Sequence, residues 1–161
     1  MWYTFDVPAV PVAKARPRAT TVGGKARMYT PKTTAHFEAL VAEHAAMKLP
    51  GVQLQGPLEM KIIFYMPRPK RLYRKCDSAL PIPHTSRPDI DNLAKSVLDG
   101  LSRHMQDDAQ VYRLALAKYY AGKEQAPCVR IEISTAGGRH DDKDSAGAGT
   151  VPSTKGGNNG A

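Results

Sequence analysis

The segment LEMKIIFY, residues 58–65, constrains the fold more than any other, because its hydrophobic side chains recur at every second position. A strand points successive side chains to opposite faces of its sheet, whereas a helix repeats about every 3.6 residues. The alternation therefore predicts a strand with one face firmly buried. The side chains expected on that face are Leu58, Met60, Ile62 and Phe64.

Three further segments have strand character. An opening strand within residues 1–13 is cut short by Pro8 and Pro11, because proline cannot donate a ladder hydrogen bond. Residues 109–121 and 128–136 predict two more strands with a short turn between them. We expect these two strands to pair with each other.

Two segments predict helices. In residues 30–51, Thr33 or Thr34 can cap the start of a helix, and Pro50–Gly51 ends it. Residues 91–103 have apolar side chains at helical spacing, which predicts a second helix with one buried stripe. The stripe consists of Leu93, Val97, Leu98 and Leu101.

The length of 161 residues fits one small domain with an appendage. We expect the domain to occupy residues 1–136. From residue 137 onward the chain is rich in Gly, Ser and Asp and has no aromatic residue. Such a composition cannot bury enough apolar surface to fold, so residues 137–161 are predicted to be a disordered C-terminal tail.

The chain has no feature of a membrane or secreted protein. No apolar run approaches the roughly 18 residues that a spanning helix needs, and the first residues lack the basic and apolar regions of a signal peptide. Cys76 and Cys128 have no close metal-ligand company, which favours reduced thiols. We expect a cytoplasmic protein without a membrane partner.

The net charge of +8 is unevenly distributed. Residues 1–88 contain 14 Lys and Arg but only 5 Asp and Glu, which indicates a polyanionic partner such as nucleic acid. Two basic stretches stand out, residues 14–32 around a hairpin tip or mobile loop at Gly23–Gly24, and residues 68–75. A solvated basic loop is the alternative for the first stretch. The predicted DNA-binding residues are Lys14, Arg16, Arg18, Lys25, Arg27, Arg68, Lys70, Arg71 and Arg74.

Acidic residues gather at two other points of this basic chain. Asp89 and Asp91 stand where an extended entry puts both carboxylates on one side of the backbone, and Lys95 shares a helix edge with Asp91. Helix capping and a plain i,i+4 ion pair are the alternatives for a single aspartate. Together with Asp107 and Asp108, however, the carboxylates are too many for capping.

If the two acidic turns meet, like charges near 4 Å repel by up to about 4 kcal/mol at an effective dielectric of 20, so a bound cation would be needed. Oxygen ligands without nearby His or Cys favour Mg²⁺, with Mn²⁺ possible, over zinc. Such a cation would polarise a scissile phosphate and generate hydroxide from bound water. Lys95 could neutralise charge on the transition state or orient the attacking water.

The stretch RPDIDNLAKSVLDGL, followed by DDAQV, resembles the RusA family of Holliday-junction resolvases (crossover junction endodeoxyribonucleases), which are Mg²⁺-dependent and common in phages. The resemblance runs from roughly residue 2 to 135. It implies that the metal site and catalysis depend on Asp89, Asp91 and Asp108, that Lys95 is needed for cleavage, and that Asp107 supports the metal site.

The resemblance also implies an α/β (α+β mixed) fold, a small single domain with a mixed sheet and two main helices. It implies a homodimer, because a four-way junction is two-fold symmetric and its resolution in DNA recombination and repair needs two symmetric nicks. The expected interface is the apolar surface of the first helix or the strand near Leu114 and Leu116.

Two other functions compete with this interpretation. A non-catalytic basic nucleic-acid-binding phage protein would explain the positive charge but not the carboxylates. A glycosyltransferase-like enzyme could use the Asp89–Asp91 pair to hold Mn²⁺, but the chain has neither the size nor a recognisable nucleotide-binding βαβ half.

Overall fold

The computed structural model describes residues 1–16, 18–22, 25–29 and 31–135. The predicted tail, residues 137–161, and the Gly23–Gly24 tip lie outside these residues. Among the helices of the described part, none combines the length and apolarity needed to cross a membrane.

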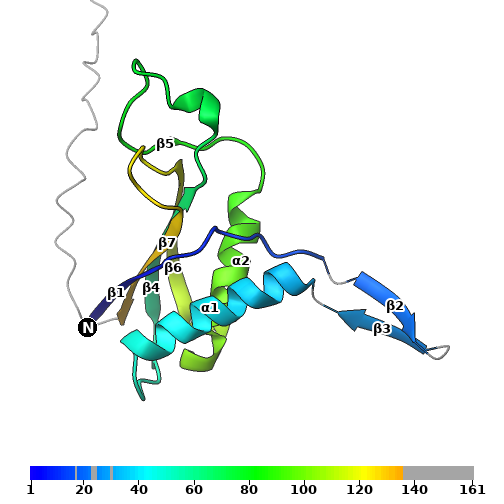
Figure 1. The fold of residues 1–161 in the computed structure, drawn as a ribbon. Helices are drawn as coiled ribbons and strands as arrows, with labels where there is room; N and C mark the ends of the chain where they lie inside the picture. The colour runs from blue at the N-terminus through cyan, green and yellow to red at the C-terminus, as the bar shows by residue number, and fades with distance from the viewer. Residues whose placement is uncertain (17, 23–24, 30, 136–161) are drawn as a thin grey trace, which may run out of the picture.

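A five-stranded sheet organises the domain, in the order β1-β7-β4-β6-β5 (Figure 1). Its strands are β1 (Trp2–Val7), β7 (Cys128–Thr135), β4 (Leu58–Met66), β6 (Val111–Tyr120) and the short β5 (Ile82–Pro83). β4 and β6 run parallel, whereas the other neighbouring pairs are antiparallel. The sheet is therefore mixed, as the fold class predicts.

The expected pairing of the last two strands is wrong. β7 lies between β1 and β4, and β6 lies on the other side of β4. The helix that connects β4 to β6 delivers β6 parallel to β4, as a crossover connection requires. β7 then takes the more enclosed position, where Val129, Ile131 and Ile133 are fully buried.

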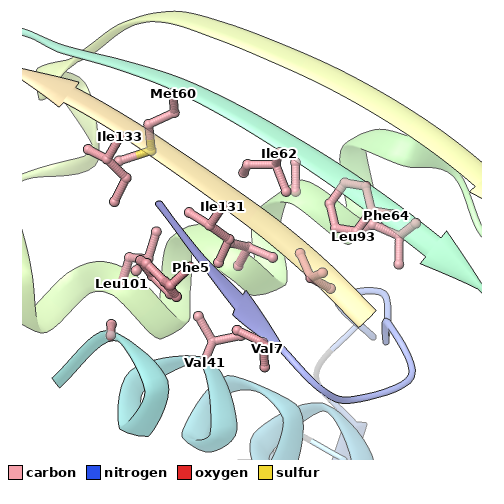
Figure 2. Packing of buried hydrophobic residues seen from close by; sticks show 14 of the residues in the cluster. Phe5, Val7, Val41, Met60, Ile62, Phe64, Leu93, Leu101, Ile131 and Ile133 are labelled. Atoms are coloured by element: carbon pink, nitrogen blue, oxygen red, sulfur yellow. The ribbon is translucent and has the colours of Figure 1, made fainter. Parts of the chain in front are cut away.

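Two helices cover one face of this sheet, α1 (Lys32–Lys48) and α2 (Ile90–Leu101) (Figure 1). The hydrophobic core lies between helices and sheet, and Figure 2 shows side chains from both layers meeting there. All four inward residues predicted for β4 are fully buried. Of the stripe predicted on α2, Leu93, Val97 and Leu101 are fully buried, and Leu98 packs against the core while partly exposed.

The cap predicted for α1 is not formed. The helix starts at Lys32 after Pro31, and no side chain caps it. Thr34 is buried, and its hydroxyl donates at 3.5 Å to the carbonyl of Ala13, so packing rather than capping uses this threonine. The predicted end is confirmed, because Gly51 has a φ of 67°, which glycine adopts readily.

The two helices approach closely at one point. A Cβ added to Gly100 of α2 would lie 2.7 Å from the Cβ of Val41 on α1, so only glycine fits there without a shift of the helices.

The first basic stretch forms an antiparallel hairpin of β2 (Arg18–Val22) and β3 (Lys25–Tyr29). It is a separate two-stranded sheet that extends past the start of α1, away from the main sheet (Figure 1). The structure favours the hairpin over the loop expected as its alternative. Three short 3-10 helices complete the described fold, η1 (Lys70–Leu72), η2 (Ser102–His104) and η3 (Asp108–Gln110).

Candidate active site

A cavity of about 700 Å³ lies where the start of α2 meets the end of β6. Its walls come from residues 83–87, the first residues of α2 and residues 116–119 of β6. Asp89 and Asp91 both line it. The predicted convergence of these two carboxylates on one side of the chain therefore agrees with the structure.

The side chains of this pair remain free for a ligand. Asp89 precedes α2, but its side chain makes no capping hydrogen bond. Asp91 Oδ2 lies 3.9 Å from Lys95 Nζ, and both side chains are more than 60% exposed. Such a pair contributes little to stability, so neither capping nor ion pairing explains these residues.

Lys118 fixes the turn that carries Asp89. Its ammonium donates to the carbonyls of Ser86 and Pro88, at 2.7 and 2.6 Å. Charge-assisted hydrogen bonds of this kind are stronger than neutral ones. Sequence reasoning missed this lysine. It lies on the same face of β6 as Leu114 and Leu116, where an apolar side chain is expected.

His84 is a second residue that the sequence did not single out. It lines the cavity, is only 8% exposed, and its ring packs 4.3 Å from the ring of Tyr120. Burial, and then the charge of Lys118, lower the pKa of this histidine. The signal available in the sequence was its position five residues before Asp89.

The second acidic turn lies at the opposite end of β6. Asp107 precedes η3 and accepts a hydrogen bond from the Ala109 amide at 2.7 Å. Gln110 donates to the carbonyls of Leu54 and Gly56, at 3.4 and 3.2 Å. These contacts tie the turn to the segment before β4, and Asp108 is exposed.

The two acidic turns do not meet within one chain. The 12 residues of α2 separate them, which corresponds to about 18 Å at the rise of an α-helix. Lys118, which contacts the first turn, is seven residues along β6 from Val111, or about 23 Å in an extended strand. In the described part of the chain, no three His, Cys, Asp or Glu residues are grouped so that they could hold a metal ion.

Two residues of the predicted DNA-binding set have side chains that bind other groups of the same chain. Lys14 Nζ lies 2.6 Å from both Glu38 and Asp99, so it joins α1 to α2. Burial alone would lower the pKa of Lys14, but the two carboxylates raise it overall. The Lys14 amide also donates to the carbonyl of Asn92 at 2.8 Å. These contacts argue against a DNA-binding role for Lys14.

Arg68 is the other residue with internal partners. It is only 8% exposed, and its guanidinium donates to the carbonyls of Ser78 and Leu80 at 2.8 and 3.4 Å. It also lies 5.7 Å from the centre of the Tyr73 ring. Arg68 therefore ties parts of the long basic loop to one another just after β4.

The remaining basic residues lie in two segments of the chain. Arg16 is exposed just before the hairpin, and Arg18, Lys25 and Arg27 belong to its strands. The exposed residues of the second basic stretch are Lys70, Arg71 and Arg74.

Comparison with known proteins gives two matches. The family model "Endodeoxyribonuclease RusA" matches residues 8–134. The chain is also 33% identical over 137 residues to the Uncharacterized protein YqaN of Bacillus subtilis (strain 168). That match covers 81% of this chain and 96% of the relative, and both matches include the two acidic turns.

Proposed function

Because the chain belongs to the RusA family of endodeoxyribonucleases, we propose that it resolves four-way DNA junctions by paired symmetric nicks. The observation that carries this proposal is the pair of uncapped carboxylates, Asp89 and Asp91, beside a cavity and next to Lys95. Hydrolysis of a phosphodiester at such a site is the activity of the family.

The chemistry of these residues suits a hard divalent cation, on which nucleases of this family generally depend. We expect Mg²⁺, with Mn²⁺ as a substitute, to be held by Asp89, Asp91 and Asp108, with Asp107 beside them. A bound cation supplies Lewis acidity toward the scissile phosphate. Lys95 would stabilise negative charge that develops on the phosphate.

One chain brings only two of these carboxylates to the cavity, so the site needs a second copy. In a homodimer, Asp108 of one protomer would join Asp89 and Asp91 of its partner. Each dimer would then contain two equivalent sites related by a two-fold axis, which matches the symmetry of two nicks in a four-way junction.

The outer edge of β6 supports this arrangement. The Lys118 carbonyl points to that edge, because it accepts from the His84 amide at 3.0 Å. By the alternation of a strand, the backbone groups of Leu116 and Leu114 point the same way, and β5 pairs only with Tyr119 and Tyr120. Along residues 112–117, no strand of the described chain occupies this edge.

Unpaired edges readily add another strand. Antiparallel pairing of two β6 strands would bring the start of one strand, with its Asp108, toward the end of the other, with its cavity. Tyr112 and Leu114 are 62% and 38% exposed and would be covered. The apolar side of α1 is less suitable, since Phe37, Val41 and Ala45 are already buried in the core.

The two basic segments would supply phosphate contacts. The hairpin carries Arg18, Lys25 and Arg27 beyond the body of the domain, with Arg16 at its base. Lys70, Arg71 and Arg74 provide a second region on the loop that Arg68 holds. Such contacts would position the junction without reading its sequence.

The deciding experiment is nicking of a synthetic four-way junction with and without Mg²⁺, compared with a linear duplex of the same sequence. We expect cation-dependent nicks at symmetric positions in the junction only. Tight junction binding without any cleavage would instead support a non-catalytic DNA-binding protein.

A further inference from the structure

His84 is a buried histidine in the wall of the Asp89–Asp91 cavity. The ring is held from two sides. The backbone amide of His84 extends the pairing of β5 with β6 by donating to the Lys118 carbonyl at 3.0 Å. The imidazole ring packs on the ring of Tyr120, with 4.3 Å between the ring centres. A ring fixed in this way presents its nitrogens in constant directions.

The two ring nitrogens have different surroundings. Nδ1 is fully buried and has no hydrogen-bond partner among the described residues. Nε2 is not among the buried unpaired atoms of the described chain. Since His84 lines the cavity, Nε2 is the nitrogen that a molecule inside the cavity can reach.

The surroundings of this imidazole favour its neutral form. Burial and the Lys118 ammonium lower its pKa, and a neutral imidazole can accept a proton. The titratable and charged groups that line the cavity with His84 come from the turn, α2 and β6, and Tyr120 packs on the ring. These groups are Arg87, Asp89, Asp91, Lys118, Tyr119 and Tyr120.

We propose that His84 is a further catalytic residue of this nuclease, and that its Nε2 orients the attacking water and accepts its proton. This proposal rests on the proposed function. In the step, the water oxygen bonds to phosphorus while one of its protons passes to Nε2. The bond from phosphorus to the 3′ oxygen breaks, and that oxygen takes a proton from solvent. The imidazolium then releases its proton to solvent.

Three substitutions separate catalysis from packing. His84→Phe keeps an aromatic ring beside Tyr120 but has no nitrogen, and His84→Gln keeps an acceptor near the position of Nε2 that cannot take up a proton. We expect the single-turnover cleavage rate to fall about 10²-fold for His84→Phe and less for His84→Gln, in the range of general-base catalysis. Junction affinity should stay within about twofold, since this step follows binding. His36→Phe, at an exposed position of α1, is the control and should cleave normally.

The third variant, His84→Ala, leaves room for an added base. Millimolar imidazole should restore part of its cleavage rate and should not affect His36→Ala. The acid limb of the pH–rate profile should disappear in His84→Gln. An unchanged rate in His84→Phe, or a loss that imidazole does not reverse in a folded His84→Ala, would overturn the proposal.

A measurement without DNA tests the same residue independently of cleavage. Long-range ¹H–¹⁵N NMR of the protein alone should find His84 neutral at pH 7 with the proton on Nδ1, because Nε2 must be free to accept. A proton on Nε2 would contradict the proposal even if the protein cuts junctions. A protein with the expected tautomer that cuts no junction would instead overturn the nuclease function and, with it, the catalytic role of His84.

Discussion

The two ends of β6 are built in different ways and serve the same purpose. At the cavity end, Lys118 reaches back 30 and 32 residues to hold the carbonyls of Pro88 and Ser86. At the other end, the turn is held by contacts within residues 106–110 and by the hydrogen bond from Gln110 to the Gly56 carbonyl, just before β4. Both ends fix a backbone turn and leave acidic side chains exposed.

The positions of the acidic residues follow from the topology of the sheet. In a β4–α2–β6 unit with parallel strands, the helix runs back along the sheet, so its start and the start of β6 lie at opposite ends. Asp89 and Asp91 therefore cannot meet Asp108 of the same chain without loss of the fold. The most informative experiments treat the two ends separately.

The largest effect is expected from Asp91→Asn. Removal of one ligand charge with little change in volume should lower junction cleavage by at least about 10³-fold, while binding in a gel-shift assay persists. Asp108→Asn at the opposite end should have the same effect. Glu124→Gln, an exposed change outside both turns, is the control. Joint loss of folding and binding would show that these acids are structural.

The open edge between the two ends provides the second test. Leu114→Lys places a charge on an edge where natural proteins use lysine to prevent strand pairing. We expect a folded monomer by light scattering and a loss of paired nicking as large as that of Asp108→Asn, because each site then lacks its third carboxylate. Leu80→Lys, at a more exposed leucine on the basic loop, is the matched control. A Leu114→Lys protein that remains a dimer would exclude this edge.

A third experiment compares the supports of the two turns. Lys118→Met leaves two carbonyls without their charged partner and should cost about 1–3 kcal/mol in the free energy of unfolding. Its cleavage rate should fall about 10-fold, since Asp89 loses its fixed position. Gln110→Ala should destabilise by a similar or smaller amount and shift Asp108. Denaturant unfolding and cleavage assays measure both effects, and normal cleavage by Lys118→Met would remove its positioning role.

Mixed dimers test directly whether a site combines both ends. Equal amounts of the Asp91→Asn and Asp108→Asn proteins, refolded together, should recover about a quarter of the wild-type nicking rate, because half of the dimers are mixed and each has one intact site. The products should be single nicks without resolution. If each chain forms its own site, the mixture stays inactive.

The smallest effect is expected from Arg16→Gln. Loss of one phosphate contact should weaken junction binding a few-fold at low salt and lower the slope of log affinity against log salt by about 1. Lys14→Gln should instead lower the melting temperature, because Lys14 joins the two helices. A salt-independent loss in Arg16→Gln would argue against phosphate contact.

The sequence predicted well the strands and helix faces that depend on local periodicity. The alternation at residues 58–64 identified the central strand, and helical spacing put Asp91 and Lys95 on one exposed edge. It failed where the outcome depends on distant partners. Two adjacent alternating segments looked like a pair, but the burial of Ile131 and Ile133 assigns the last strand to the other side of β4.

Charge patterns did not show which basic residues have internal partners, for the same reason. A basic residue in a basic stretch looks available to DNA, yet Lys14 has carboxylate partners on two helices and Arg68 has carbonyl partners in its own loop. His84 and Lys118 were missed because a lone histidine or lysine carries no motif. Their positions in the cavity wall follow from the register of β5 and β6.

The backbone amide of Lys14 links two segments that lie far apart in the sequence. Its hydrogen bond to Asn92 fastens the chain just before the hairpin to the first turn of α2, one residue from Asp91. A backbone hydrogen bond thus joins the segment that leads into the hairpin to the helix turn that carries Asp91.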